Sequence, residues 1–425
     1  MKCRVAGTWL RPLMLLLPLL GTAALGGCTS HAASDLDSGA DGGGPSLELF
    51  TWWVAPGEVE ALTALVNVYQ SDYPGARVDQ FNDATSANWE SMLAKRINTP
   101  TFDVTQISAA GIPVFLDDNK GTLAPVDDIY AEPSLKAAVI PDILAAATDN
   151  GHAMGVVTGV HRNNAFIYNM QVLQKYNLAP PTTIAEFLNV CATLKAAGIT
   201  PVATTLDAWI LRFLYLDILS GVVGADTFGA FVRHELPVGS DQMQSGIQEA
   251  TQDFVDVYTK YVDLPAMQAP NYDWTTAADS LRAGKTAMFF LGDWLKGYLV
   301  TLGWTPGVDF GVSGPPGASD VFVYGADTFA LPTMAPHPQL AHDFLQVVAS
   351  PAAQVAFNLK KGSTPMRTDV RAMLDGPGQR NLDDLVNATV RLPGFDNAMM
   401  DTAMTNYVNT GDAAALLKAL QTIEP

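Results

Sequence analysis

Two adjacent tryptophans, Trp52 and Trp53, with an acidic residue shortly after them at Glu58, are the residues of this chain best suited to bind a ligand. A pyranose ring offers C–H faces that stack on indole, and its hydroxyls hydrogen-bond to carboxylates and amides. Packing of both indoles in a core is the alternative, and it is the commoner arrangement for a tryptophan pair. The polar turn at residues 54–57, just before a helix start at Glu58, favours exposure. The pair therefore predicts a carbohydrate contact.

Patterns for catalysis and for cofactor binding are missing from the sequence. Gly284-Lys285-Thr286 resembles the end of a phosphate-binding loop, but Asp279 stands where that loop needs a glycine. The six histidines lack the spacing of metal ligands, and no nucleophile elbow or dinucleotide fingerprint is present. The sequence therefore predicts a binding protein with no cofactor and no metal, and not an enzyme.

Charge and composition exclude two further classes. The 425 residues carry a formal charge of −19, which argues against a nucleic-acid partner because phosphate binding needs clustered lysines and arginines. The hydrophobic fraction of 48% excludes a mainly disordered chain. At roughly 100–200 residues per domain, the length predicts two or three folded units. Three cysteines are too few for a disulfide framework.

The N-terminus has the pattern of an export signal. Basic residues at Lys2, Arg4 and Arg11 precede a short apolar run at residues 13–20, which is too short and too interrupted for a membrane span. Small residues follow, and the sequence LGGC that ends at Cys28 resembles a bacterial lipobox, in which the cysteine becomes the lipidated first residue. An ordinary signal with Cys28 as a bystander thiol is the alternative.

The segment after Cys28 is rich in glycine, serine, alanine and aspartate, which is typical of a flexible tether. We therefore expect a lipoprotein signal peptide at residues 1–27 and a tether at residues 28–46. This arrangement predicts an exported protein of the cell envelope, in the periplasm or on the outer face of the cytoplasmic membrane, held there by a lipid on Cys28.

The elements that must position the tryptophans alternate between strand and helix. Apolar periodicity predicts strands at residues 47–52, 77–81 and 103–107 and helices at residues 58–73 and 86–97. This order is typical of a doubly wound parallel sheet, which binds ligands at the carboxyl ends of its strands. The tryptophan pair stands at the end of the first strand.

A second, mainly helical region follows. We expect strands at residues 154–157, 165–168, 286–290, 322–324 and 328–331 and helices at residues 170–176, 183–197, 206–220 and 243–261. Cys191 lies within one of these helices and is predicted to be an inert core residue.

At this point the sequence resembles a known family, the extracellular solute-binding proteins of ABC sugar transporters (family 1), and within it the branch that binds glucose and mannose. The resemblance covers residues from about 47 to about 371 and rests on the order of several short motifs. These are residues 50–53 with 57–58, 122–128, 159–164 with 168–169, 180–183 with 186–187, 196–201, 284–288 with 292–294, 306–310 and 361–367.

The resemblance implies an α/β fold of the Venus-flytrap type, with two lobes, hinge crossovers and a ligand cleft between the lobes. The first lobe would hold residues 47–158 and 286–330, and the second would hold residues 159–285 and 331–425. The crossovers would lie near residues 157–161, Met288 and Ala330.

The resemblance also assigns sugar-binding roles to residues of the first half of the chain. Trp52 and Trp53 would stack on the sugar ring, Glu58 would accept hydrogen bonds from hydroxyls, and Gln106, at the end of the third strand, would hydrogen-bond to other hydroxyls.

Four more site residues are implied from the rest of the chain. Trp209 and Trp274 would cover the second face of the sugar, and Asp327 and Lys361 would complete the polar ring. The residues themselves leave alternatives: Trp209 could belong to a core, Asp327 could bond locally, and Lys361 could lie on the surface. Trp274 stands in a loop-like stretch, which favours exposure.

Three other residues receive structural roles. His161 and Arg162 are expected to belong to the hinge, and Asp293 is expected to cap the helix after it. The chain departs from the family at Ser108 and near residues 392–397, where the family usually has histidines. The sequence therefore predicts the class of ligand and not the individual sugar.

The implied activity is capture of a monosaccharide such as glucose and its delivery to the transporter's permease subunits, by a monomer tethered to the membrane. An exported glycoside hydrolase is one alternative, since Glu58 and Asp327 could form its carboxylate pair. A sugar-sensing subunit of a signalling system is another.

Overall fold

The computed structural model describes residues 45–81, 89–394 and 397–425. Residues 1–44 lie outside this part, so the predicted signal peptide, almost all of the tether and Cys28 are not described. None of the helices among the described residues combines the length and the apolar character that crossing a membrane requires.

The first sheet is built around the predicted strand–helix alternation. β1 (Ser46–Phe50) pairs in parallel with β2 (Arg77–Phe81) and with β3 (Val104–Ser108), and α1 (Glu58–Asp72) and α2 (Trp89–Arg96) connect these strands. Gly57 is the N-cap residue of α1, and its φ of 87° is a conformation that glycine adopts without strain. The sequence prediction of a β-α-β-α-β unit is confirmed.

Two long strands, β7 (Val156–Arg162) and β12 (Val321–Pro332), form an antiparallel pair that extends this sheet. The full order is β13-β12-β3-β1-β2, with β4 and β7 also paired to β12. β12 is one continuous strand where the sequence predicted two, and its register to β7 shifts between Asp327 and Thr328. Such a bulge re-aims the side chains beside it.

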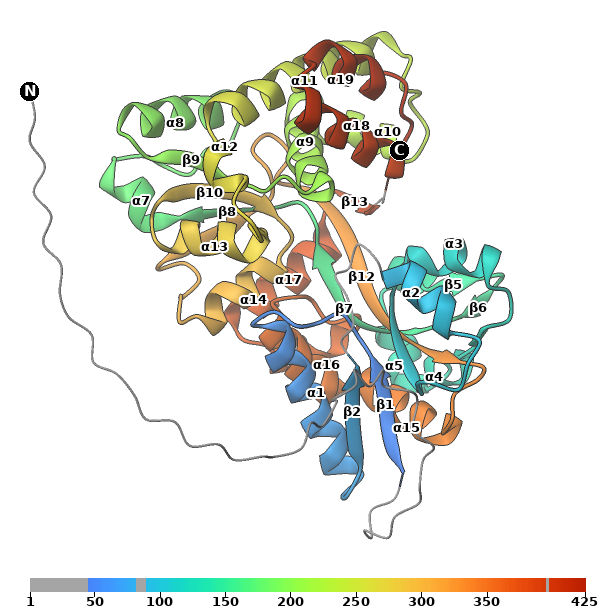
Figure 1. Cartoon of the computed structure of the whole chain (residues 1–425). Coiled ribbons are helices and arrows are strands. Elements are labelled where there is room, and N and C mark those ends of the chain that lie inside the picture. Colours follow the sequence, from blue (N-terminus) through green and yellow to red (C-terminus); the bar gives the residue numbers. More distant parts are fainter. Residues whose placement is uncertain (1–44, 82–88, 395–396) are drawn as a thin grey trace, which may run out of the picture. The chain divides into compact units, whose positions relative to one another are not determined.

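The second sheet has the order β11-β8-β10-β9. β8 (Ala165–Asn169) is antiparallel to both β10 (Thr286–Leu291) and β11 (Phe310–Ser313), while β9 (Thr200–Ala203) is parallel to β10. Its longer helices are α8 (Ile184–Ala196), α9 (Ala208–Val223), α11 (Asp241–Lys260), α13 (Trp274–Arg282) and α14 (Trp294–Thr301). In Figure 1, α9, α11, α18 and α19 gather into one helical layer.

The remaining elements complete the two sheets and their surroundings. Around the first sheet these are α3 (Gly111–Asp118), β4 (Leu123–Ala124), α4 (Asp127–Tyr130), α5 (Pro133–Ala138), α6 (Pro141–Ala146), β5 (Thr148–Asp149), β6 (His152–Ala153), α15 (Pro338–Ala349), α16 (Pro351–Lys361), the 3-10 helix η2 (Thr368–Met373), α17 (Gly376–Asn387) and β13 (Val390–Pro393). Around the second sheet they are α7 (Met170–Lys175), α10 (Ala225–Val232), α12 (Leu264–Met267), α18 (Ala398–Thr410) and α19 (Ala413–Leu420).

Each sheet has its own hydrophobic core, which defines two lobes. The core of the first lobe joins Leu49 of β1 to Phe344 of α15 and Phe357 of α16. The core of the second lobe contains Phe166, Phe290 and Cys191 together with residues of α9, α11 and α18. Cys191 is buried and its pKa is raised by that burial, as expected of an inert core thiol.

Two of the predicted lobe boundaries are wrong. Residues 286–313 were expected in the first lobe, but β10 and β11 belong to the sheet of the second lobe. Residues 338–361 were expected in the second lobe, but α15 and α16 pack in the first, where α16 lies beside α1 in Figure 1. The chain therefore re-enters the first lobe along β12, and neither Met288 nor Ala330 is a crossover.

The first crossover lies at Asn163 and Asn164, between β7 and β8 and just beyond the predicted residues 157–161. Arg162 fastens it to the start of β12, because its Nη2 donates to the carbonyls of Ser319 (2.8 Å) and Val321 (2.7 Å). The amide of Asn164 also donates to the Val321 carbonyl, at 3.0 Å. The hinge role predicted for Arg162 agrees with these contacts.

Candidate ligand-binding site

Lys361 and Glu58 form a buried ion pair at the start of α1. The Lys361 Nζ donates to Oε1 of Glu58 at 2.9 Å, and the two side chains are only 3% and 14% exposed. Oε2 of Glu58 accepts from the backbone amides of Val54 (3.3 Å) and Ala55 (3.2 Å). The alternative that Lys361 is a surface residue is therefore wrong. The pair places one positive and one negative side chain in fixed positions next to the turn that carries the tryptophans.

Gln106, the middle residue of β3, turns its side chain toward the same turn. Its Oε1 accepts from Oγ1 of Thr51 (2.6 Å) and from the amide of Trp52 (3.2 Å). Its Nε2 is buried and lies close enough to the Asp327 carboxylate to lower the pKa of that group, but it makes no well-aligned hydrogen bond among the described residues. A buried N–H group without a well-aligned acceptor is costly, so this amide is suited to a ligand oxygen.

The two predicted stacking tryptophans differ in exposure. Trp52 is half-buried and meets Trp89 edge to face at 5.1 Å between ring centroids. Trp53 is 0% exposed and packs against Phe329 (5.5 Å) and Phe357 (5.0 Å) in the first core. The expectation that Trp53 stacks on a sugar is therefore wrong in this structure, because successive side chains of an extended chain point to opposite sides.

Asp327 lies on β12 at the bulge, close to Gln106 and to Lys361. Burial alone would raise the pKa of Asp327, but His161, Lys361 and Gln106 outweigh it and lower this pKa. Oδ2 of Asp327 is 3.1 Å from Nε2 of His161. The carboxylate is thus kept ionised and able to accept hydrogen bonds.

His161, on β7, links Asp327 to Asp293. Its Nδ1 is 2.6 Å from Oδ1 of Asp293, and the other oxygen of Asp293 accepts from the Arg162 amide at 3.0 Å. Asp293 was expected to cap α14, but its side chain makes no capping hydrogen bond there, because these partners on β7 occupy both of its oxygens. Sequence spacing gives no sign of such a long-range pair.

Half-buried aromatic rings of the second lobe adjoin His161. Trp294 meets the imidazole edge to face at 5.5 Å, and Trp209 and Phe213 lie 6.2 Å from Trp294 and 5.6 Å from each other. Trp209 is thus neither fully buried in a core nor fully exposed. Phe213 and Trp294 were not among the predicted site residues; Trp294 belongs to a quoted motif, whereas Phe213 is one helical turn from Trp209 and could have been found from that spacing.

Trp274 is the first residue of α13 and is half-buried, not fully exposed in a loop. Its ring meets Tyr298 edge to face at 5.3 Å. Tyr298 and Trp294 are one turn apart on α14, so Trp274 joins the aromatic patch through that helix.

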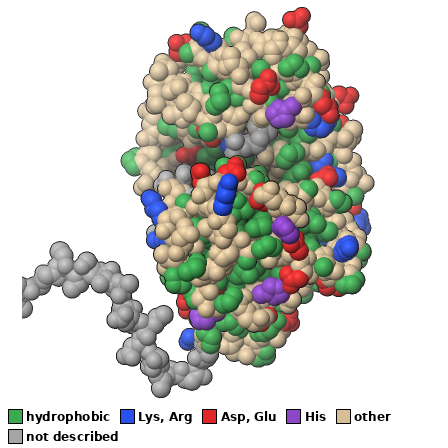
Figure 2. Space-filling view, turned by 90° about the vertical axis from the view of Figure 1, so that its right-hand side faces the viewer, with side chains coloured by type: hydrophobic (Ala, Val, Ile, Leu, Met, Phe, Trp, Pro, Cys, Tyr) green, Lys and Arg blue, Asp and Glu red, His purple; other side chains and the backbone are tan. Residues whose placement is uncertain are grey.

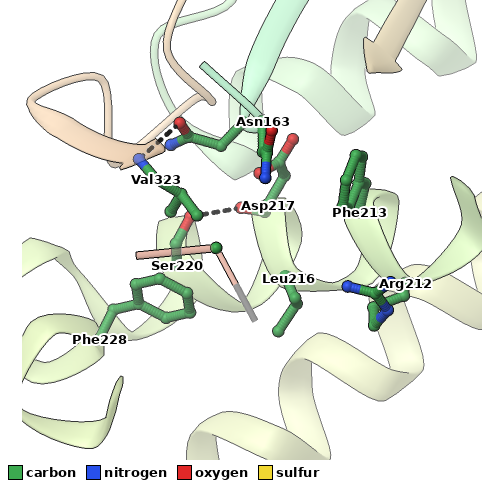
Figure 3. Close-up of a pocket in the computed structure, with 10 residues that line it drawn as sticks. Asn163, Arg212, Phe213, Leu216, Asp217, Ser220, Phe228 and Val323 are labelled. Atoms are coloured by element: carbon green, nitrogen blue, oxygen red, sulfur yellow. Dashed lines mark hydrogen bonds between the residues drawn. The ribbon is translucent and has the colours of Figure 1, made fainter. Parts of the chain in front are cut away.

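A small pocket lies at the crossovers, beside these rings. Figure 3 shows Asp217 among Asn163, Phe213 and Val323, and Ser220 donates to the Asp217 carbonyl at 2.8 Å. The Asp217 side chain is buried, and its Oδ2 has no partner among the described residues. Burial raises the pKa of Asp217 well above its ordinary value, and Arg162 offsets this only in part.

The described part of the surface is hollowed on one face. Figure 2 shows this hollow with acidic side chains and a basic side chain at its border. No group of three or more histidine, cysteine, aspartate or glutamate side chains within residues 45–81, 89–394 and 397–425 is arranged to hold a metal ion. The groups gathered around Asp327 are a carboxylate, an amide, a lysine and indoles, which suit a neutral polar ligand with a flat face.

Known proteins of similar sequence share most of their length with this chain. An uncharacterised ABC transporter extracellular-binding protein from Pyrococcus horikoshii is 29% identical over 341 residues, which cover 79% of this chain and 75% of the relative. A probable sugar-binding periplasmic protein from Rhizobium meliloti is 27% identical over 365 residues, covering 85% and 86%.

Solved structures agree in fold. The bacterial solute receptor AcbH, described with an exclusive preference for β-D-galactopyranose, superposes with a TM-score of 0.74 at 14% identity. A chitin oligosaccharide binding protein superposes with a TM-score of 0.72 at 17% identity, and both matches cover 89% of this chain and 97% of the other. The predicted two-lobed α/β fold is confirmed.

The family model for bacterial extracellular solute-binding proteins matches residues 55–355, which is more than half of the chain. That match includes the turn at Glu58, the Asp327 bulge, the crossover at Asn163 and Asn164 and the crossover between β11 and β12. The chain belongs to the bacterial extracellular solute-binding protein family.

Proposed function

We propose that this protein is the substrate-binding receptor of an ABC transporter and that it captures a sugar at the site around Asp327. The observation that carries the proposal is the buried Nε2 of Gln106, which lacks a well-aligned acceptor among the described residues, beside the ionised Asp327 and next to the half-buried ring of Trp52. One donor, one acceptor and one indole are what a pyranose ring with hydroxyl edges needs. The Rhizobium meliloti relative, described as sugar-binding, supports this class of ligand.

The proposed cycle is capture and delivery. Sugar bound to Trp52, Gln106 and Asp327 in the first lobe would also touch Trp209, Trp294 and Trp274 of the second. A ligand that contacts both lobes stabilises the closed arrangement, because only that arrangement gives it both sets of contacts. We propose a monosaccharide such as glucose as the cargo, and permease subunits of the transporter as the partner of the closed form.

For the N-terminus we propose export by a signal at residues 1–27 and lipidation at Cys28, with a monomer tethered by the segment that follows. We also propose that the lobes are divided as their hydrophobic cores indicate, and not at the boundaries predicted from the sequence. The lowered pKa of Asp327 speaks against the carboxylate pair of Glu58 and Asp327 as the catalytic groups of a glycoside hydrolase. A hydrolase needs one carboxyl group with a raised pKa as its general acid, and the pKa of Asp327 is lowered.

The proposal is tested by calorimetry on the chain without residues 1–28, against D-glucose, D-galactose, D-mannose, D-xylose and their disaccharides. We expect at least one monosaccharide to bind with a Kd near 1 µM, or about −8 kcal/mol. At a hundredfold excess over Kd, that sugar stabilises the fold by about 2.7 kcal/mol, which a thermal melt detects. Absence of binding by every sugar contradicts the proposal, and release of reducing ends from the disaccharides favours the hydrolase.

A further inference from the structure

His161 has a carboxylate at each of its two ring nitrogens. Asp293 lies 2.6 Å from Nδ1, and Asp327 lies 3.1 Å from Nε2. An ionised carboxylate only accepts hydrogen bonds, so both contacts are hydrogen bonds only when both ring nitrogens carry a proton. The geometry therefore calls for the imidazolium form of a side chain that is 4% exposed.

The two carboxylates are held by different parts of the fold. Asp293 follows β10 of the second lobe, where its amide donates to the Arg162 carbonyl at 3.0 Å and its Oδ2 accepts from the Arg162 amide. Asp327 belongs to β12, whose pairing with β3 places it near Gln106. His161 thus connects the first crossover, the start of α14 and the proposed sugar acceptor.

We propose that His161 is a positioning residue for sugar binding: as an imidazolium it holds Oδ2 of Asp327 and leaves Oδ1 to accept a hydrogen bond from a sugar hydroxyl. The inference rests on the proposed function, and it adds a residue that need not touch the sugar itself. Without the imidazolium, Asp327 would lose the donor that fixes its orientation at the bulge.

Three charged groups act on His161: Asp293, Asp327 and Lys361. Burial alone would lower the pKa of His161 and Lys361 also lowers it, but the two carboxylates outweigh them and the pKa is raised. Because the pKa is raised, the imidazolium persists to a higher pH than in a free histidine and is lost as the pH rises through that pKa. Sugar affinity is therefore expected to fall on the alkaline side, where one nitrogen becomes an acceptor facing a carboxylate.

The charge of His161 is measured directly by NMR of histidine labelled with ¹⁵N, in the ligand-free protein without residues 1–28. We expect both ring nitrogens of His161 to be protonated at pH 7, and the same spectra record His152 for comparison. His152 is a matched control, because it also contacts an aspartate, Asp127, but is exposed to water. A single-proton tautomer of His161 at pH 7 overturns the proposal, whether or not any sugar binds.

The link to binding is measured by calorimetry with the tightest-binding monosaccharide of the panel named above. His161→Gln is expected to weaken binding at least tenfold, while His152→Gln changes it less than twofold. The alkaline loss of affinity should disappear in His161→Gln. In an Asp327→Asn background, His161→Gln should have almost no further effect, because it acts through Asp327.

Melting curves show whether each variant is folded. Fully additive effects of His161→Gln and Asp327→Asn, or a folded His161→Gln protein that binds as tightly as the original, overturn the positioning role. A panel in which no sugar binds overturns the proposed function and this role together, and the NMR result still separates the charge of His161 from that failure.

Discussion

Lys361, the last residue of α16, donates to Glu58, the first residue of α1, across 2.9 Å in a part of the structure that excludes most water. The pair joins two helices that are 303 positions apart in sequence. The lysine also lies beside the aromatic ring of Trp53, with the Nζ 5.5 Å from the ring centroid. The turn that carries Trp52 is therefore held in two ways: by the ion pair at Glu58 and by the packing of Trp53 in the core of the first lobe.

Removal of one partner of this pair is expected to be costly. Lys361→Met leaves the Glu58 carboxylate buried without its cation, so the free energy of unfolding should fall by about 3–5 kcal/mol. Urea denaturation followed by circular dichroism measures this change. Lys360→Met, at the exposed neighbouring position, is the control and should shift the midpoint little. Equal shifts for the two variants would contradict a structural role of the pair.

Trp53→Ala is expected to act on stability. The indole is fully buried between Phe329 and Phe357, and its loss leaves a cavity that costs about 3–5 kcal/mol. If the variant remains folded, its affinity for sugar should change less than that of Trp52→Ala. A Trp53→Ala protein of unchanged stability and abolished binding would restore Trp53 as a direct sugar contact.

Trp52→Ala and Trp209→Ala are expected to weaken sugar binding about tenfold each, with little change in melting temperature. Loss of one stacked ring corresponds to roughly 1 kcal/mol or more of contact free energy, beyond its area. Trp304→Ala is the matched control, since Trp304 is also half-buried in the second lobe but stacks on Phe310. Calorimetry that finds the same affinity for Trp209→Ala and Trp304→Ala would remove Trp209 from the site.

Asp217→Asn is expected to make the protein more stable at neutral pH and less sensitive to pH. The raised pKa means that the folded state keeps Asp217 protonated while the unfolded chain ionises it above its ordinary pKa near 4. Its contribution therefore destabilises the fold progressively as the pH rises above that value. Arg162, the cation that opposes this effect, is intact in the variant.

Denaturation of the two proteins between pH 4 and pH 8 measures that difference. We expect the curves to converge at pH 4 and to separate by about 1–2 kcal/mol at pH 8, the usual cost of burying an unsatisfied polar group. Curves that stay parallel over the whole range would show that Asp217 does not titrate differently in the two states.

Local sequence patterns predicted the helices and strands well, because apolar periodicity and turn residues determine the conformation of residues close to them in the sequence. The strands and helices from Ser46 to Ser108 agree with the prediction to within three residues wherever they are described. Two strands, by contrast, were predicted at residues 322–324 and 328–331, whereas β12 runs through Gly325 between them with only a bulge nearby. A glycine within a strand sequence is compatible with a strand break and with a bulge, and only pairing with a neighbouring strand decides between the two.

Lobe membership was the weakest prediction because it depends on pairing between distant segments. The start of β10 was predicted correctly. Its apolar sequence, however, does not indicate whether the strand pairs with β3 or with β8. The same holds for His161 and Asp293, which are 132 positions apart. The motif resemblance drew attention to both residues, but their contact follows only from the packing of β7 against the end of β10.

The fastening of Arg162 to the Ser319 and Val321 carbonyls has a mechanical consequence. Two chain segments that cross between the lobes are clamped to each other at one guanidinium, so neither can bend without the other. We therefore expect these two segments to bend together when the lobes move. His161 is the residue before Arg162, so its contacts with Asp293 and Asp327 stand directly beside this clamp.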